Sequence, residues 1–407
     1  MKIFKFFVKE IFFKRILFII GVFLLAFMAN YLVFTATRSS ISTLLGYKEV
    51  SYLKKDNSFV ANLDPSSPYD LNDISEEEIK EVYDYLGENF TYGFYTDGVV
   101  ANLDNPYDME VSFAYLNETY DKINSFDIAK GENISFDYDL KKNDEIPVLI
   151  GHGLSENYPI GSKIDLFEYG LLDDVRLRVV GILNKDDYRT NIYVLNSKQY
   201  NNFSVILPIN DSYIEKANLA LKAQGLSDLI LLDTNEKEIA ELKAYIKDKL
   251  NFDFNFLTQE EISANFKEYY LDALKLILLV SGIIALILSF INIYLSISGL
   301  NMMIKDLTIN LFAGLSLEGL RKIFYKFFLG LFALNLLGLY AFVSISRYGS
   351  WLRKEILSAT FGFLSLTSID WMAFGLVVLF NLIMCLVIVE ISMARIKKIP
   401  ISLGVLQ

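Results

Sequence analysis

The 407-residue sequence contains one cysteine, Cys385, and one histidine, His152. Cys385 lies in an apolar run, so the long polar stretch of the chain can form neither a disulfide nor a thiolate metal site. A His/carboxylate metal cluster, a Ser/His/Asp triad and a Cys/His dyad each have at most one imidazole available. We interpret His152, which lies between two glycines, as an ordinary turn residue.

A phosphate-binding loop is also missing. No segment matches G-x-x-x-x-G-K-[ST], the pattern whose backbone amides and lysine hold nucleotide phosphates. The chain therefore cannot hydrolyse ATP by that route. We expect a non-catalytic protein with no catalytic, metal-binding or cofactor-binding residues of its own.

Four apolar runs are long enough to cross a membrane, which takes roughly 20 residues in a helix. They are Ile16–Ala36, Leu276–Leu300, Ile323–Ile345 and Trp371–Val389. The first could instead be a secretory signal, but its apolar core exceeds the ~7–15 residues of such a signal and no A-x-A cleavage site follows it. The sequence thus predicts transmembrane helices over residues 16–36, 271–300, 323–346 and 370–390.

Charge divides the chain into two parts. Residues 16–265 contain 21 Lys or Arg and 41 Asp or Glu, whereas the rest of the chain is positive, so the formal net charge of −11 combines two opposite surfaces. The acidic part argues against binding to nucleic acid or to anionic headgroups, and it could attract cationic peptides. An alternative is that its acidity serves only the solubility of an exported domain.

Basic residues next to a span favour the cytoplasmic side of the membrane. The N-terminal segment 1–15 contains Lys2, Lys5, Lys9, Lys14 and Arg15. The loop 301–322 and the tail 391–407 are also basic, so we expect both termini and this loop in the cytoplasm. Residues 37–270 then form an extracytoplasmic domain. The loop 347–369 is predicted to be extracellular, although its three basic residues weaken the rule there.

The extracytoplasmic domain has the pattern of a mixed α/β fold. Ser75 is placed to cap a helix over 75–88, with three glutamates in its first turn, and a strand is predicted over 92–100. The same order returns as a strand over 229–232, a helix over 236–250 and a strand over 252–257. We therefore predict an α-helical membrane protein with four transmembrane helices and a mixed α/β extracytoplasmic domain between helices 1 and 2.

A series of short strands and glycine turns lies between these two units. Its segments are IAKGE (128–132), IPVLIG (146–151), YPIGSKIDL (158–166) and LRVVGIL (177–183). The series resembles the extracytoplasmic core domain of MacB-like permeases, which belong with FtsX and the LolC/LolE proteins to one ABC transporter superfamily. Gly131, Gly161 and Gly181 fall where short strands must turn, at positions where positive φ costs little only for glycine.

Residues 302–316, MMIKDLTINLFAGLS, are similar to the family motif E-I-G-I-x-R-A-L-G-A-S, a short helix that seats on the ATPase subunit. Helical spacing puts four apolar residues of this segment on one face and its polar residues on another. The resemblance implies an ATPase-coupling set of Lys305, Asp306, Asn310, Ala313, Gly314 and Ser316. Asp306, Thr308 and Leu311 depart from the motif, and the missing arginine at 311 removes one expected ion pair. We expect Gly314 to end the helix.

The tail provides a smaller match, in which Pro400 and Leu403 resemble the terminal segment of the family. The resemblance implies a bacterial cell-membrane complex of two permease chains, identical or different, with two separate ATPase subunits. ATP and Mg would then bind in the partner chain, and this chain would need no cofactor.

Three functions remain in view. The first is an ABC transporter permease in which ATP-driven tilting of spans one and two moves the extracytoplasmic domain to export or extract an amphipathic cargo such as a peptide, lipid, lipoprotein or drug. The second is an FtsX-like transmitter that activates an extracellular partner such as a cell-wall hydrolase. The third is a free-standing receptor or adhesin, which leaves the coupling loop unexplained.

The apolar spans contain few polar residues. Asn292, Asn335 and Asn381 are interpreted as residues that join helices, and Asp370 as an exposed residue at a span end.

Overall fold

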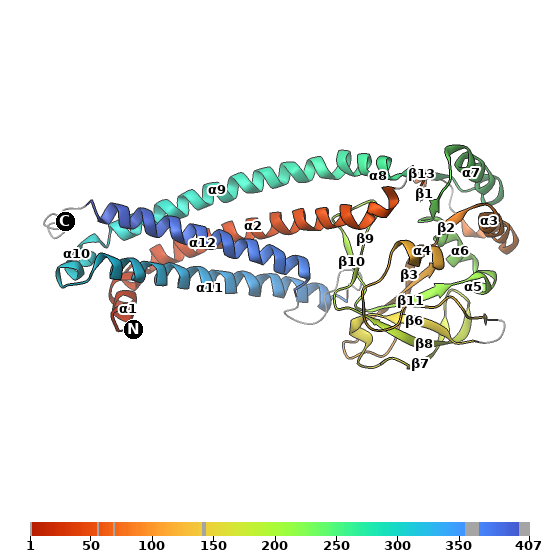
Figure 1. Cartoon of the computed structure of the whole chain (residues 1–407), viewed down its shortest axis with the longest axis horizontal. Helices are drawn as coiled ribbons and strands as arrows, with labels where there is room; N and C mark the ends of the chain where they lie inside the picture. The colour runs from red at the N-terminus through yellow and green to blue at the C-terminus, as the bar shows by residue number, and fades with distance from the viewer. Residues whose placement is uncertain (1, 55–56, 68–69, 141–143, 355–365, 399–407) are drawn as a thin grey trace. The chain divides into compact units, whose positions relative to one another are not determined.

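The computed structural model describes residues 2–54, 57–67, 70–140, 144–354 and 366–398 (Figure 1). The chain divides into two compact units. We call them the helical unit, which contains Met1–Ile41, Asp272–Ser346 and Leu366–Gln407, and the α/β unit, which contains Ser42–Leu271 and Arg347–Ser365.

Among the described residues, four helices are long and apolar enough to cross a membrane. They are α2 (Ile16–Glu49), α9 (Asp272–Asn301), α11 (Leu317–Leu352) and α12 (Ser368–Ile396). Three short helical segments precede α2, namely α1 (Lys2–Phe6), the π-helix η1 (Phe7–Phe12) and the 3-10 helix η2 (Phe13–Arg15). The short helix α10 (Ile304–Phe312) lies between α9 and α11. The predicted fold class, four spans with an α/β domain after the first, is confirmed.

The helices continue beyond the predicted spans. The last turns of α2, from Ser42 to Glu49, belong to the α/β unit, as does the end of α11 from Arg347 onward. The segment predicted as an extracellular loop over 347–369 therefore begins as helix. Hydropathy marks where a helix is apolar, but a helix ends where its backbone hydrogen bonds end, and polar turns can prolong it.

The described part of the α/β unit contains three sheets. The seven-stranded sheet has the order β3-β4-β11-β6-β8-β5, with β7 on β8; the four-stranded sheet has the order β13-β1-β12-β2; and β9 pairs with β10. The strands of the largest sheet are β3 (Tyr95–Ala101), β4 (Val111–Asn117), β5 (Ile128–Gly131), β6 (Ile146–Ile150), β7 (Lys163–Glu168), β8 (Asp173–Leu183) and β11 (Ser204–Ile209). The hairpin consists of β9 (Tyr188–Thr190) and β10 (Lys198–Tyr200).

The seven-stranded sheet is covered on both faces. Along β4, Phe113 and Tyr115 belong to one buried cluster, whereas Ala114 and Leu116 belong to another. Successive side chains of a strand point to opposite faces, so both faces pack against other elements. The short helices α4 (Glu118–Ile123), α5 (Asp211–Lys216) and α6 (Leu219–Leu226) accompany this sheet.

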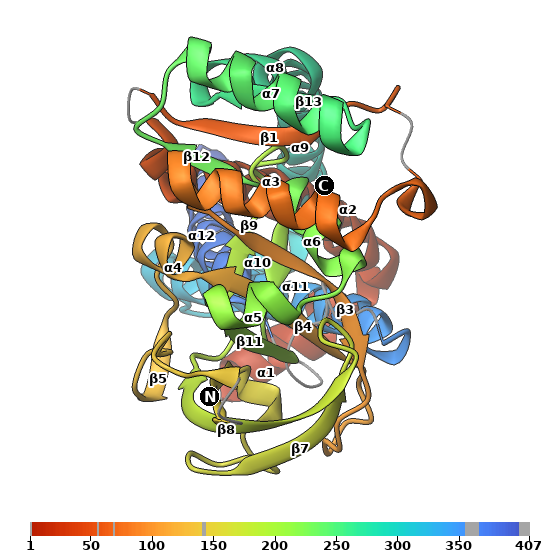
Figure 2. The ribbon, with the colours of Figure 1, turned by 90° about the vertical axis from the view of Figure 1, so that its right-hand side faces the viewer.

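The two predicted helix-and-strand units meet in the four-stranded sheet, but the single strand predicted over 92–100 is wrong, because it is divided between β2 of this sheet and β3 of the seven-stranded sheet. Its strands are β1 (Phe59–Leu63), β2 (Thr91–Gly93), β12 (Ile230–Leu232) and β13 (Phe254–Thr258). The helices α3 (Glu76–Asn89) and α7 (Glu236–Leu250) pack beside one another, as Figure 2 shows. Ser75 caps α3 and Asn235 caps α7, each within a reciprocal capping box. The helix predictions at both places are confirmed.

Strands β1 and β13 pair along their whole length, from Phe59 opposite Thr258 to Leu63 opposite Phe254. The chain enters the sheet through β1, after α2, and leaves it through β13, before α8 (Gln259–Phe266), the π-helix η7 (Lys267–Leu271) and α9. The first and last strands of the α/β unit are therefore immediate neighbours.

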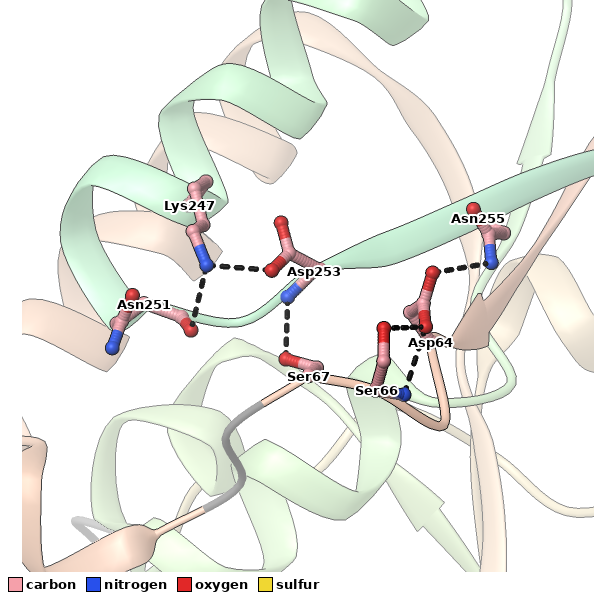
Figure 3. Close-up of polar contacts among 7 residues, drawn as sticks. All are labelled: Asp64, Ser66, Ser67, Lys247, Asn251, Asp253 and Asn255. Carbon is pink, nitrogen blue, oxygen red and sulfur yellow. Dashed lines mark hydrogen bonds and ion pairs between the residues drawn. The ribbon is translucent and has the colours of Figure 1, made fainter.

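A polar cluster closes the far end of this strand pair (Figure 3). The Asp64 carboxylate accepts hydrogen bonds from the backbone N–H and hydroxyl of Ser66 and from the Asn255 amide. The Ser66 hydroxyl and N–H hold the pKa of Asp64 below its usual value. Beside it, Lys247 of α7 lies 2.6 Å from the Asp253 carboxylate. The cluster ties the loop after β1 to β13 and α7.

Two of the three glycines predicted in turns have the expected backbone. Gly131 and Gly161 have φ of 88° and 86°, in the left-handed region. The turn prediction for Gly181 is wrong, because Gly181 lies inside β8 opposite Gly131. A Cβ at Gly181 would lie 2.4 Å from the Glu132 carbonyl oxygen and 2.7 Å from a Leu149 methyl carbon. Glycine is required there by the close approach of neighbouring strands.

We expect Gly181→Val to lower the free energy of unfolding by about 1–3 kcal/mol, because the added atoms must displace a backbone carbonyl and a core side chain. The measurement is the thermal midpoint of the purified full-length chain in detergent. Gly87→Ala is the matched control, since nothing lies within 4 Å of a Cβ at that helical position. It should stabilise the chain by roughly 0.5–1 kcal/mol. Equal midpoints for the two variants would contradict this account of Gly181.

Candidate functional site

The predicted coupling segment folds as α10 and the turn after it. Met303, Leu307 and Thr308 are buried, and the Thr308 hydroxyl donates to the Ile304 carbonyl at 2.8 Å. Lys305 and the residues Ala313, Gly314 and Ser316 are exposed. One side of this segment is thus held by the helical unit while the other is accessible.

The end of α10 is fixed by its own backbone. Gly314 has φ of 96°, and the Leu315 N–H donates to the Asn310 carbonyl at 3.0 Å, as in a glycine-terminated helix. The Ser316 hydroxyl accepts from the Gly319 N–H and so caps α11. Asp306 and Asn310 are only half-buried, and the Asn310 amide donates to the Asp306 carbonyl at 2.7 Å.

Four of the six predicted coupling residues line one groove. Its volume is about 590 Å³, and Asn310, Ala313, Gly314 and Ser316 form one wall of it. The other wall consists of Ile3, Phe6 and Phe7 from the N-terminal segment. Sequence reasoning missed these three residues, although their i, i+3, i+4 spacing is the signal of an apolar helix face. Lys305 and Asp306 lie outside this groove.

The apolar face predicted for α10 lines a second, smaller cavity of about 210 Å³. Ile304, Leu307, Leu311 and Leu315 meet Ile396 and Lys397 at the end of α12 there. Pro400 and Leu403, the predicted tail residues, lie outside the described residues. Among the residues that the structure describes, no group of three His, Cys, Asp or Glu side chains is placed to hold a metal ion.

Asparagine side chains join the helices around α2. Asn30 donates to Asn335 at 2.7 Å and accepts from Asn381 at 3.0 Å, and all three side chains are buried. Asn335 also donates to the Phe23 carbonyl, and Asn292 of α9 donates to the Val22 carbonyl. The interpretation of these residues as joining groups is confirmed. Asn30, the centre of the cluster, was missed because one polar residue in an apolar run does not reveal its partners.

Asp370 is not the exposed residue expected at a span end. It is 0% exposed and lies 2.7 Å from Nε of Arg38 on α2. Its carboxylate also accepts hydrogen bonds from the N–H and hydroxyl of Thr367, so it caps α12. A carboxylate can be buried here because a cation and two donors surround it.

The outer end of α2 is fixed within the α/β unit. The Glu49 carboxylate accepts hydrogen bonds from Tyr188 at 2.5 Å, from Lys198 at 2.9 Å and from Thr190, all on the β9–β10 hairpin. One turn earlier, a Cβ at Gly46 would lie 1.9 Å from the Leu195 carbonyl oxygen. The helix and the hairpin are therefore in direct backbone contact, and we call this contact the α2 joint.

The second helix that leaves the α/β unit meets the first one there. The rings of Tyr47 on α2 and Phe266 on α8 lie 5.8 Å apart, edge to face. Phe266 is buried in the same cluster as Leu195 and Ile262. The two helical connections are thus joined to each other as well as through β1 and β13.

A titratable group lies beside the α2 joint. Asp187, which directly precedes β9, accepts a hydrogen bond from Asn201 at 2.8 Å. Burial raises the pKa of Asp187 to about 6, and the nearby Asp127 and Glu49 carboxylates act in the same direction.

Comparison with known proteins identifies the chain. The family model of the MacB-like periplasmic core domain matches residues 17–248. The chain belongs to this family. It is a MacB/FtsX-like ABC transporter permease, a multi-pass membrane protein whose α/β unit is extracytoplasmic, and the family works with an ATPase partner.

Two solved domains are similar to part of this permease. The extracellular domain of the noncanonic ABC-type transporter YknZ from Gram-positive bacteria is 13% identical, with a TM-score of 0.31, covering 49% of this chain and 100% of that one. The periplasmic region of MacB from Actinobacillus actinomycetemcomitans is 11% identical, with a TM-score of 0.31, covering 52% and 93%. A comparison with curated proteins gave no match.

Asp187 makes the stability of the permease depend on pH. The pKa of Asp187 is raised above its usual value of 3.8, so the folded protein holds this proton more tightly than the unfolded chain does. The stabilisation by the protonated carboxyl group is therefore fully present below pH 3.8 and is lost as the pH rises through about 6. Asp187→Asn, which keeps an acceptor for Asn201, should remove a loss on the order of 2 kcal/mol over this window. The measurement is the thermal midpoint from pH 4 to 7. Asp137→Asn, at an exposed carboxylate, is the control and should follow the parent protein; parallel profiles for all three proteins would refute the assignment.

Proposed function

We propose that this chain is the permease subunit of a MacB/FtsX-type transporter and that it converts ATP hydrolysis in a separate subunit into motion of the extracytoplasmic α/β unit. The motion would export or extract an amphipathic cargo such as a peptide, lipid, lipoprotein or drug. The observation that carries the proposal is that α2 is one helix from Ile16 to Glu49, with its end fixed to the β9–β10 hairpin.

The cytoplasmic end of the mechanism is the surface around α10. The exposed residues Ala313, Gly314 and Ser316, with Ile3 and Phe6 across the groove, offer an apolar recess to the ATPase. Leu307 is buried on the opposite side of α10, so a force on this helix acts on packed neighbours. In this arrangement both termini are cytoplasmic, and ATP and Mg bind in the partner.

The spans support transmission of motion without a polar path. The buried asparagines bond to one another and to backbone carbonyls, and so hold α9, α11 and α12 against α2. Side chains of a permeation path would instead face water or cargo. A second permease chain, identical or different, completes the proposed complex with two ATPase subunits. Its contact would lie on α9, where Leu279, Phe290 and Tyr294 are exposed.

The outer end of the mechanism is the α2 joint. Three donors from one hairpin bind the Glu49 carboxylate. These bonds fix the position of α2 along its axis, and its rotation about that axis, relative to the hairpin. Because β1 and β13 are paired, α2 and α9 lead into adjacent strands. Tilting of these two helices would therefore move one sheet as a body.

Two variants test the docking surface. We expect Ala313→Arg, which places a long cation in the groove, and Gly314→Val, which is strained at φ of 96°, to abolish stimulation of the partner ATPase. The measurement is ATP hydrolysis by the partner ABC ATPase, co-expressed with the permease and reconstituted in lipid. Gly282→Ala in α9, where nothing lies within 4 Å of a Cβ, is the control and should stimulate normally.

Membrane insertion of each variant is checked by its yield in the membrane fraction. Full stimulation by inserted Ala313→Arg permease would show that the ATPase docks elsewhere.

A further inference from the structure

The outer end of α11 is built into the α/β unit through an aromatic chain. The ring of Trp351 meets the edge of Tyr107 at 5.9 Å, and Tyr107 meets Phe203 at 5.7 Å. Phe203 is 1% exposed and belongs to the largest buried cluster of the unit, against which Trp351 and Tyr107 also pack. A continuous set of ring contacts thus leads from the last helical turn of α11 into the core.

The loop that receives Trp351 is preformed. The Asn105 side chain accepts hydrogen bonds from the N–H groups of Tyr107 and Met109 and donates to the Leu103 and Met109 carbonyls. An exposed ion pair adds to the contact, since Nζ of Lys354 lies 2.5 Å from the Asp108 carboxylate. This hydrogen bond lowers the pKa of Asp108. The loop is therefore held by hydrogen bonds of its own and by an ion pair to the end of α11.

Ring packing holds Trp351 in place. Its Nε1 is buried and has no hydrogen-bond partner among the described residues, whereas its ring also packs on Tyr348 at 5.1 Å. Because packing holds the indole, its position is sensitive to loss of the facing Tyr107 ring.

This contact lies at a different sheet from the other two helical connections. The chain segments that follow α2 and precede α9 are β1 and β13 of the four-stranded sheet. Phe203 directly precedes β11, which is a central strand of the seven-stranded sheet. An α/β unit attached only through the β1–β13 pair can rotate about the axis of these two strands. An additional attachment away from that axis, such as the contact of Trp351, determines the angle of rotation.

We propose that Trp351 is a positioning residue that makes α11 the third helix attached to the extracytoplasmic unit, so that movement of span three sets the tilt of that unit about the β1–β13 pair. The inference rests on the proposed function, because it assigns a role in the same ATP-driven motion. It adds a specific residue and a specific span to a mechanism that the chain path alone assigns to spans one and two.

The two tryptophans of the chain make a direct test available. Trp371→Phe leaves Trp351 as the only tryptophan of the permease, which can then be labelled with fluorotryptophan and combined with unlabelled ATPase. We expect one fluorine resonance that shifts when Tyr107→Ala removes the facing ring and stays near its place in Tyr107→Phe, which keeps the ring. In the complex with stimulated hydrolysis, trapping with ATP and vanadate should shift the resonance, and Tyr107→Ala should abolish that response while Tyr107→Phe retains it.

The outcomes separate this inference from the proposed function. If the fluorine chemical shift does not change in Tyr107→Ala, or does not change on trapping while hydrolysis is stimulated, the role of Trp351 alone is overturned. A permease that stimulates no ATPase overturns the proposed function, and the inference with it. Folding of each variant is measured by its thermal midpoint. Trp351→Phe replaces the indole by a smaller ring, so its midpoint should be close to that of the parent protein and hydrolysis should stay stimulated.

Discussion

Backbone pairing of β1 with β13 holds the two ends of the α/β unit together. These strands are the first and last of the α/β unit, and five residue pairs bring the entering and leaving chain side by side. The residues between β1 and β13 therefore begin and end at the same strand pair. The two ends cannot separate without breaking a ladder of backbone hydrogen bonds. The capped helices α3 and α7 and the polar cluster around Asp64 reinforce the same sheet.

Helix α2 has a comparable place in the helical unit. Every other long helix bonds to it through a buried polar group: α9 through Asn292, α11 through Asn335, and α12 through Asn381 and Asp370. Lipid tails are as apolar as leucine, so burial of apolar surface does little to choose helix neighbours in a membrane, whereas a hydrogen bond between side chains does. These few polar contacts therefore define which helices surround α2.

The α2 joint connects the helix at the centre of the polar contacts to the α/β unit. Glu49 ends a helix whose apolar part lies in the helical unit, and its carboxylate is held by three side chains of one hairpin in the α/β unit. Lys198 is nearly fully buried there, and burial lowers its pKa despite the partner carboxylate. Separation of the two groups would leave the buried Lys198 ammonium without its carboxylate, although Glu49 itself is 32% exposed. In the proposed mechanism, this contact would make the hairpin follow α2.

The sequence predicts the four apolar helices, the α/β domain after the first, and the bounds of α7, because hydropathy, helical spacing and capping residues are local patterns. It also predicts that Gly314 ends a helix. Four features could not be predicted from local patterns: Asn30 bonds to residues more than 300 positions away, Gly181 lies in a strand, Asp370 is buried, and Trp351 packs on Tyr107. Each of these depends on the register between elements that are distant in the chain. A residue's local pattern fixes its own helix or strand, but which neighbour it faces is set by packing.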